Sequence, residues 1–222
     1  MTIKLNMPEK LPIDPETNTR YSCLDQINRE WWRQIASLVS TGTDRTGGIF
    51  KITDNCLEMP WFNRIVSINP AIKSMTYLND SIFKPGYQDG LVIMALLNYL
   101  TKHSQLPPDT ELINENHLTG GTTFFRGPHQ MASINVAQYF ETKGEEFIKT
   151  ARLWGGKSAP YGEFGIKFEL FPGLHWIVAL WLKDAEFPAR AQYLFDRKLE
   201  RLFKFDIIWA LGNLVASKLR IN

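Results

Sequence analysis

Three acidic residues near the end of the chain have the type and spacing that metal chemistry uses. Asp184 and Glu186 stand two residues apart in a predicted loop, and Asp196 stands at the predicted start of a helix. Carboxylate oxygens bind hard divalent cations, and two carboxylates in one site can act as an acid–base pair. The residues therefore allow a metal site, and with it a small metal-dependent enzyme. The pattern favours the competing structural interpretation, in which Asp196 caps the helix and Glu186 bonds loop amides.

A second group of candidates combines histidine with tryptophan. His175 begins an apolar run, Trp176 follows it, and Trp181 lies near the end of the same run. A histidine among aromatic side chains is a type of ligand that holds haem iron or a corrinoid cobalt. A lone histidine is more often a hydrogen-bonded structural residue, and most tryptophans belong to a core. These three residues are nevertheless the candidates for a flat, apolar cofactor pocket.

A third candidate is an anion site around the glycine pair at residues 120–121. His117 and His129 flank this pair and Arg126 lies between them, so the three side chains could bind a propionate or a phosphate. A phosphate loop would need a helix after the glycines, whereas residues 122–125 predict a strand. The glycines therefore predict a turn, and the anion site depends on the three side chains alone.

Motifs for other chemistries are absent from the sequence. There is no Gly-x-Ser-x-Gly nucleophile motif, no Cys-x-x-Cys-His haem attachment and no Asp-x-His-x-x-Gly pattern of common cobalamin domains. The two cysteines, Cys23 and Cys56, are too few to ligate an iron–sulfur cluster and lack the close spacing of a zinc site. The residues therefore identify no nucleophile and no reaction.

The elements that must position these residues are clearest between residues 162 and 222. Apolar and polar residues alternate over residues 166–170, which predicts a half-exposed strand. A Pro-Gly turn follows, and then residues 174–182 are apolar on both faces, as in the middle of a covered sheet. A loop, a helix from Asp196 and a last helix from Asp206 complete this part.

The strongest helix prediction covers residues 90–102, with Asp89 as its N-cap. This helix has almost no polar face, so we expect it to be buried and central. Together these elements predict an α+β fold, in which an antiparallel sheet is covered by the buried central helix and the C-terminal helices.

The remaining segments predict one domain with a short appendage. Residues 1–20 contain three prolines and predict an extended N-terminal arm, and residues 21–222 predict a single α+β domain. Within that domain a helix begins at Asp25, and residues 49–52 and 56–59 form a small hairpin around an Asp-Asn turn. Two further helices are expected at residues 133–142 and 145–154.

Composition limits the class of protein and its partners. The 222 residues are 44% apolar and 13% aromatic, which suffices for a sizeable core. The net charge is +2 without a basic run, which gives no case for nucleic acid or an anionic membrane as partner. There is no signal peptide and no apolar run long enough to span a bilayer, so we expect a cytoplasmic protein with reduced thiols.

A resemblance to a known family is carried by four pieces of sequence, which in chain order are GYQDGLVIMALLNYL, HLTGGTTFF, RLWGG and FELFPGLHWIVALWLKDAEFPARAQYLFD. Over roughly residues 25–218 the chain resembles the domain-of-unknown-function family numbered 3786, of anaerobic bacteria and archaea. Some relatives are fused to an iron–sulfur domain similar to that of corrinoid iron–sulfur proteins of acetyl-CoA metabolism. The resemblance implies a fold and an anaerobic setting, and it implies no known activity.

Three functional hypotheses follow. The first is a non-catalytic protein that binds or handles a cofactor in anaerobic metabolism, for which a tetrapyrrole (corrinoid or haem) near His175 is the candidate. The second is the metal-dependent enzyme that uses Asp184, Glu186 and Asp196. The third is an interaction module that docks on an iron–sulfur protein.

Overall fold

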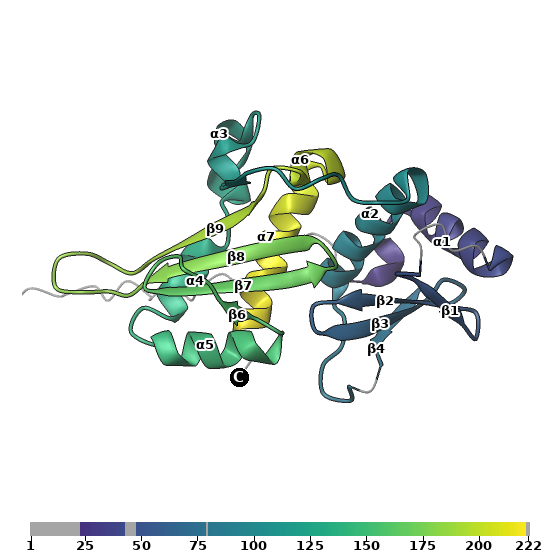
Figure 1. The fold of residues 1–222 in the computed structure, drawn as a ribbon, viewed down its shortest axis with the longest axis horizontal. Coiled ribbons are helices and arrows are strands. Elements are labelled where there is room, and N and C mark those ends of the chain that lie inside the picture. The colour runs from purple at the N-terminus through teal and green to yellow at the C-terminus, as the bar shows by residue number, and fades with distance from the viewer. Residues whose placement is uncertain (1–22, 43–47, 79, 221–222) are drawn as a thin grey trace, which may run out of the picture.

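The computed structural model describes residues 23–42, 48–78 and 80–220, so the predicted arm at residues 1–20 lies outside the described part (Figure 1). The fold is α+β, as predicted, but its strands form two antiparallel sheets where the sequence predicted one. Strand pairing joins residues far apart in sequence, so the number of sheets does not follow from local patterns.

The first sheet is a meander of neighbouring strands. In the order in which they pair, these are β1 (Lys51–Thr53), β2 (Cys56–Trp61), β3 (Arg64–Asn69) and β4 (Ser74–Tyr77). The predicted hairpin between β1 and β2 is confirmed, and its turn residues Asp54 and Asn55 have φ of 50° and 61°. Asn and Asp tolerate this left-handed conformation better than other residues with a side chain, which is why the pair makes a hairpin turn here.

The second sheet contains the long hairpin of residues 164–181. Its strands, in the order in which they pair, are β5 (Leu112–Ile113), β9 (Arg190–Asp196), β8 (Leu174–Trp181), β7 (Phe164–Phe171) and β6 (Lys157–Ser158). The predicted strands are confirmed by the pairing of Phe168 with Trp176, and the turn has Gly173 at φ 77°. The face that carries Phe168, Trp176 and Tyr193 is buried.

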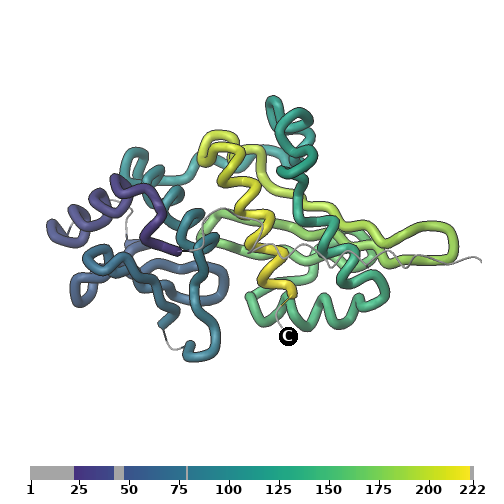
Figure 2. The backbone as a smooth tube through the Cα atoms, turned by 180° about the vertical axis from the view of Figure 1, so that it is seen from behind, coloured from purple at the N-terminus to yellow at the C-terminus, as the bar shows by residue number. Residues whose placement is uncertain are grey.

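Helices cover that buried face and join the two sheets. The longer ones are α1 (Arg29–Thr41), α2 (Tyr87–His103), α4 (Ser133–Tyr139), α5 (Gly144–Leu153) and α7 (Phe205–Leu219). The short ones are η1 (Leu24–Gln26), η2 (Glu115–His117), α3 (Gly121–Phe124), η3 (Gly127–His129) and α6 (Leu199–Leu202). Figure 2 shows α7 and α4 crossing the strands of the second sheet, while α2 contacts α7 and lies between the two sheets.

Several local predictions are corrected by the structure. Residues 122–125, predicted as a strand, belong mostly to helix α3. Asp89, predicted as an N-cap, is the third residue of α2, and Gly86 is the N-cap. Asp196, predicted to cap a helix, ends strand β9, and Lys198 precedes α6. In each case a tertiary contact outweighs the local preference of the residue.

Asp89 is buried because it is the centre of a hydrogen-bonded network. Trp61 Nε1 and Tyr77 OH donate to its Oδ1 at 2.9 and 3.0 Å, while Gly86 N and Lys218 Nζ donate to its Oδ2 at 2.9 and 2.8 Å. Burial and the nearby carboxylate raise the pKa of the Tyr77 hydroxyl well above its usual value, so it stays a donor. The network ties the first sheet, α2 and α7 together.

The two sheets also meet directly at Phe62, in the turn between β2 and β3. Its backbone N–H donates to the carbonyl of Leu170 in β7 at 2.8 Å, and its ring lies 5.8 Å from both Trp154 and Phe168. Phe62 has φ of 53°, a strained conformation for a bulky residue, and this packing holds it there. In the described part of the chain no helix is both long and apolar enough to cross a membrane.

Candidate functional site

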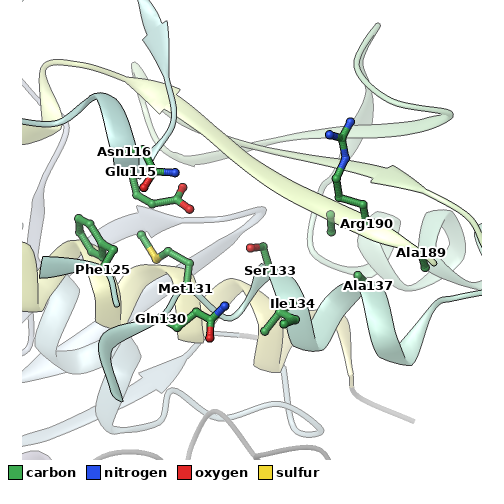
Figure 3. A pocket seen from close by; sticks show the side chains of 11 residues that line it. Glu115, Asn116, Phe125, Gln130, Met131, Ser133, Ile134, Ala137, Ala189 and Arg190 are labelled. Carbon is green, nitrogen blue, oxygen red and sulfur yellow. The ribbon is translucent and has the colours of Figure 1, made fainter. Parts of the chain in front are cut away.

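A pocket of about 460 Å³ opens between η2, the start of α4 and the start of β9 (Figure 3). Its polar lining consists of Glu115, Asn116, Gln130 and Ser133. Its apolar lining includes Phe125, Met131, Ile134 and Ala137. A cavity of this size falls within the range of small-molecule sites.

Glu115 is the unusual residue of this pocket. Its Oε2 is buried and has no hydrogen-bond partner among the described residues. Burial raises the pKa of the carboxyl group, against the smaller opposing effects of its own backbone N–H and of His117. In Figure 3 the carboxylate extends from η2 into the space beside Met131. A buried carboxylate oxygen without a partner costs stability.

The segment that carries Glu115 is held in place from several sides. Asn114 caps η2 by accepting from Asn116 N at 3.0 Å. Arg197 Nη1 donates to the carbonyl of His117 at 3.0 Å, and Glu200 Oε1 accepts from Thr119 N at 2.6 Å. These bonds fix the backbone on both sides of Glu115, so its side chain has a defined place at the pocket wall.

The glycine pair after η2 explains how this segment packs. Gly120 has φ of 88°, in the left-handed region that glycine adopts without strain. A Cβ on Gly121 would lie 1.9 Å from the carbonyl oxygen of Glu115, so only glycine allows α3 to approach η2 this closely. The pair is therefore neither a phosphate loop nor the turn before a strand. It lets the backbone around Glu115 pack against α3.

The opposite wall is anchored on α7. Trp209 Nε1 donates to the carbonyl of Gln130 at 3.2 Å, and the rings of Phe124 and Phe125 lie 5.3 and 5.5 Å from that of Phe205. Helix α7 also comes close to Met131, whose Sδ lies 2.9 Å from where a Cβ of Gly212 would stand. The pocket is thus built on the most buried helix of the second sheet.

Arg190 is also among the residues that line the pocket. Its guanidinium group points away from Glu115 in Figure 3 and lies 4.0 Å from the ring centre of Trp181, which pairs with Arg190 across β8 and β9. There it borders a second, more apolar pocket of about 500 Å³ that Leu182 and Phe187 also line. The Arg190 charge therefore does not neutralise Glu115.

The predicted anion site lies beside the pocket without lining it. His117 and Arg126 are exposed, and the His129 ring is stacked 4.6 Å from the ring of Phe124. Their sequence neighbours Asn116, Phe125 and Gln130 line the cavity instead. The three predicted side chains therefore lie next to residues that line the pocket and do not line it themselves.

The predicted cofactor residues on β8 do not share one site. His175 and Trp176 are successive strand residues, so they point to opposite faces of the sheet. His175 Nε2 lies 3.6 Å from Glu169 Oε1, and burial is the main cause of the lowered pKa of His175. Trp176 is buried, and its ring centre lies 4.7 Å from that of Phe195. Trp181 stands at the far end of the strand, about 20 Å from His175 at the usual rise per residue. Neither His175 nor Trp176 lines the two pockets described above.

The predicted metal ligands are also separated. Asp184 Oδ1 accepts from Glu186 N at 2.8 Å and Phe187 N at 2.7 Å, which lowers its pKa and closes the loop. Asp196 stands at the other end of β9, where it accepts from the N–H groups of Thr110 and Lys198, both at 2.8 Å. Glu186 is exposed. Across residues 23–42, 48–78 and 80–220, no group of three or more His, Cys, Asp or Glu side chains is placed to hold a metal ion.

Sequence reasoning missed the residues that form the pocket, above all Glu115, Met131 and Ser133. The available indication was the polar run of residues 114–116, which ends four positions before the glycine pair, because a Gly-Gly after a short polar turn indicates a close backbone approach. Nothing in the run showed that one of its side chains would be buried without a partner.

Comparison with known proteins identifies the family. The model of the domain of unknown function DUF3786 matches residues 40–218, most of the chain, so the chain belongs to this family. Comparisons with curated proteins and with solved structures give no match.

Proposed function

We propose that this DUF3786-family protein binds a small organic molecule in the pocket at Glu115, without catalysing a reaction on it. The observation that carries the proposal is the side chain of Glu115, which lines the cavity and has no ion-pair partner among the described residues. A carboxylate at the wall of a cavity can accept a hydrogen bond from a bound ligand.

The shape and lining of the pocket support a small ligand. A volume of about 460 Å³ falls within the range of sites for metabolite- and drug-sized molecules. Met131 and Ala137 offer buried apolar contact, and Asn116, Gln130 and Ser133 can orient polar groups of the ligand. This keeps the predicted class, a non-catalytic binding protein, and moves its site from His175 to Glu115.

The finer predictions stay proposals within this class. A corrinoid or haem ligand and a cytoplasmic location are expected from the sequence, and the absorbance of the protein after anaerobic incubation with either tetrapyrrole, with and without His175→Ala, tests the first. The metal-dependent enzyme and the module that docks on an iron–sulfur protein stay predictions that none of the contacts above favours.

The proposal is tested with methionine methyl groups as reporters. In protein labelled at the methionine ε-methyl, the Met131 signal, assigned through Met131→Leu, should shift when fragment-sized ligands or a host metabolite extract are added. Ser133→Trp fills the cavity and should abolish these shifts. Gln138→Trp places the same ring on the exposed side of α4 and should leave them unchanged. If no compound shifts the Met131 signal, or if the two tryptophan variants respond alike, the proposed function is wrong.

A further inference from the structure

We propose that the ligand of this pocket presents a protonated nitrogen, as in an ammonium, amidinium or guanidinium group, to the carboxylate of Glu115. The inference rests on the proposed function and names the chemical class of the ligand. It follows from the residues that surround Glu115, from the acceptors that neighbouring donors already bind, and from the lining of the rest of the cavity.

The polar groups that share the pocket with Glu115 carry no charge. Asn116, Gln130 and Ser133 are neutral, and the guanidinium group of Arg190 is turned to the other side of β9. The carboxylate is therefore the charged group that points into the cavity. A ligand that brings a cation gains a charge-assisted hydrogen bond there, which is about twice as strong as a neutral one.

Two potential donors around this segment are already bonded to other acceptors. The hydroxyl of Tyr193, which is fully buried, donates to the carbonyl of Gly212 at 3.1 Å. Arg197 binds Glu111 Oε1 at 2.7 Å and the carbonyl of His117 at 3.0 Å. Glu115 forms no ion pair with any of the described residues, so a cation on a ligand would be its counter-ion.

The lining of the rest of the cavity favours an organic cation over a metal ion. Hard divalent cations need six or more oxygen ligands, roughly, and Glu115 is the carboxylate among the lining residues. Phe125, Met131 and Ala137 are buried and give a ligand limited apolar contact. The lining therefore suits an organic cation better than a metal ion.

The test compares three probes of one size: pentylammonium, pentan-1-ol and pentanoate. Each is titrated into methionine-methyl-labelled protein at neutral pH, and the Met131 shift gives its dissociation constant. Pentylammonium should bind about tenfold to a hundredfold more tightly than the alcohol, and pentanoate more weakly than both. Glu115→Gln keeps the shape of the side chain and should remove this advantage, while the affinity for the alcohol should not change.

Glu186→Gln is the matched control, because it removes an exposed acid outside the pocket and should leave all three affinities as they are. The inference is overturned if pentylammonium binds Glu115→Gln as tightly as the unaltered protein, or if pentanoate binds as well as the amine. If neutral fragments shift the Met131 signal and cations do not, the ligand class is wrong and the proposed function stands. If no probe or fragment shifts that signal, the proposed function itself fails.

Discussion

Glu115 costs the folded protein stability in a way that depends on pH. Burial raises its pKa above the ordinary value of 4.5 that it has in the unfolded chain. Below 4.5 the carboxyl is protonated in both states and no penalty exists. As the pH rises through the raised pKa, the unfolded chain gains more from ionisation, so the stability of the fold falls. Above the raised pKa the penalty is complete.

Glu115→Gln should therefore stabilise the protein at neutral pH. We expect the free energy of unfolding to rise by about 1 kcal/mol at pH 7, because the buried negative charge is removed. The gain should shrink towards pH 4, where Glu115 is already neutral. Urea denaturation at both pH values measures this, with Glu186→Gln as the exposed control. A variant that is less stable than the parent at pH 7 would contradict the assignment of an unpaired carboxylate.

At the scale of single residues, the sequence shows which side chains could bind a ligand, but it does not show which of them line the pocket. His117, Arg126 and His129 attract attention because they are cations near glycines, yet the pocket takes the uncharged residues beside them. Glu115 looks like an ordinary surface acid in the sequence. Its importance depends on burial and on where Tyr193 and Arg197 direct their donors, and residues far away along the chain decide both.

At the scale of the element, α3 and the glycine pair position the pocket wall. Gly121→Ala should disturb this wall and cost about 3 kcal/mol or more, because the new Cβ would meet the backbone oxygen of Glu115 and neither group can move away cheaply. The matched control is Gly127→Ala, where φ is 55° but no atom lies within 4 Å, so only about 1–2 kcal/mol of backbone strain is expected.

Thermal unfolding and the Met131 methyl signal together check this prediction. Gly121→Ala should lower the unfolding midpoint further than Gly127→Ala does, and it should move the Met131 signal in the absence of ligand. Equal effects of the two variants would show that the close contact between η2 and α3 does not contribute to the stability of the fold.

Long periodic elements could be predicted, and short ones could not. The hairpin of β7 and β8 follows from alternation around a Pro-Gly turn, and α2 follows from its continuous apolar surface. By contrast, Thr122 and Thr123 favour a strand by propensity, yet they form α3, a single turn of helix whose stability comes from the packing of Phe124 on Phe205. The split into two sheets is likewise a matter of long-range pairing.

At the scale of the whole molecule, one hydrophobic cluster extends across both sheets, and the Asp89–Lys218 ion pair is buried within the structure. The side chain of Lys218 also lies 4.3 Å from the ring centre of Trp154, so its ammonium group has an aromatic partner as well. A buried charge is stable only while its partner is present. The pair therefore makes the last helix a requirement for the integrity of the first sheet and α2.

Lys218→Met should destabilise the protein by about 3–5 kcal/mol, because it leaves the Asp89 carboxylate buried with its counter-ion gone. The double variant with Asp89→Asn should lose less than the sum of the two single variants, since it removes both charges. Denaturant unfolding of all four proteins gives the coupling energy. Lys204→Met, an exposed lysine at the start of α7, is the control and should change stability by less than about 0.5 kcal/mol. Strictly additive losses would show that the two side chains do not depend on each other.

The distance along the chain between Asp89 and Lys218 has a consequence for synthesis on the ribosome. The two residues lie 129 positions apart, so a nascent chain exposes α2 and the first sheet long before α7 leaves the exit tunnel. During that interval Asp89 lacks its cation, and the apolar surface of α2 lacks the helix that covers it. Co-translational folding of the first sheet and α2 should therefore stay incomplete until α7 has been synthesised.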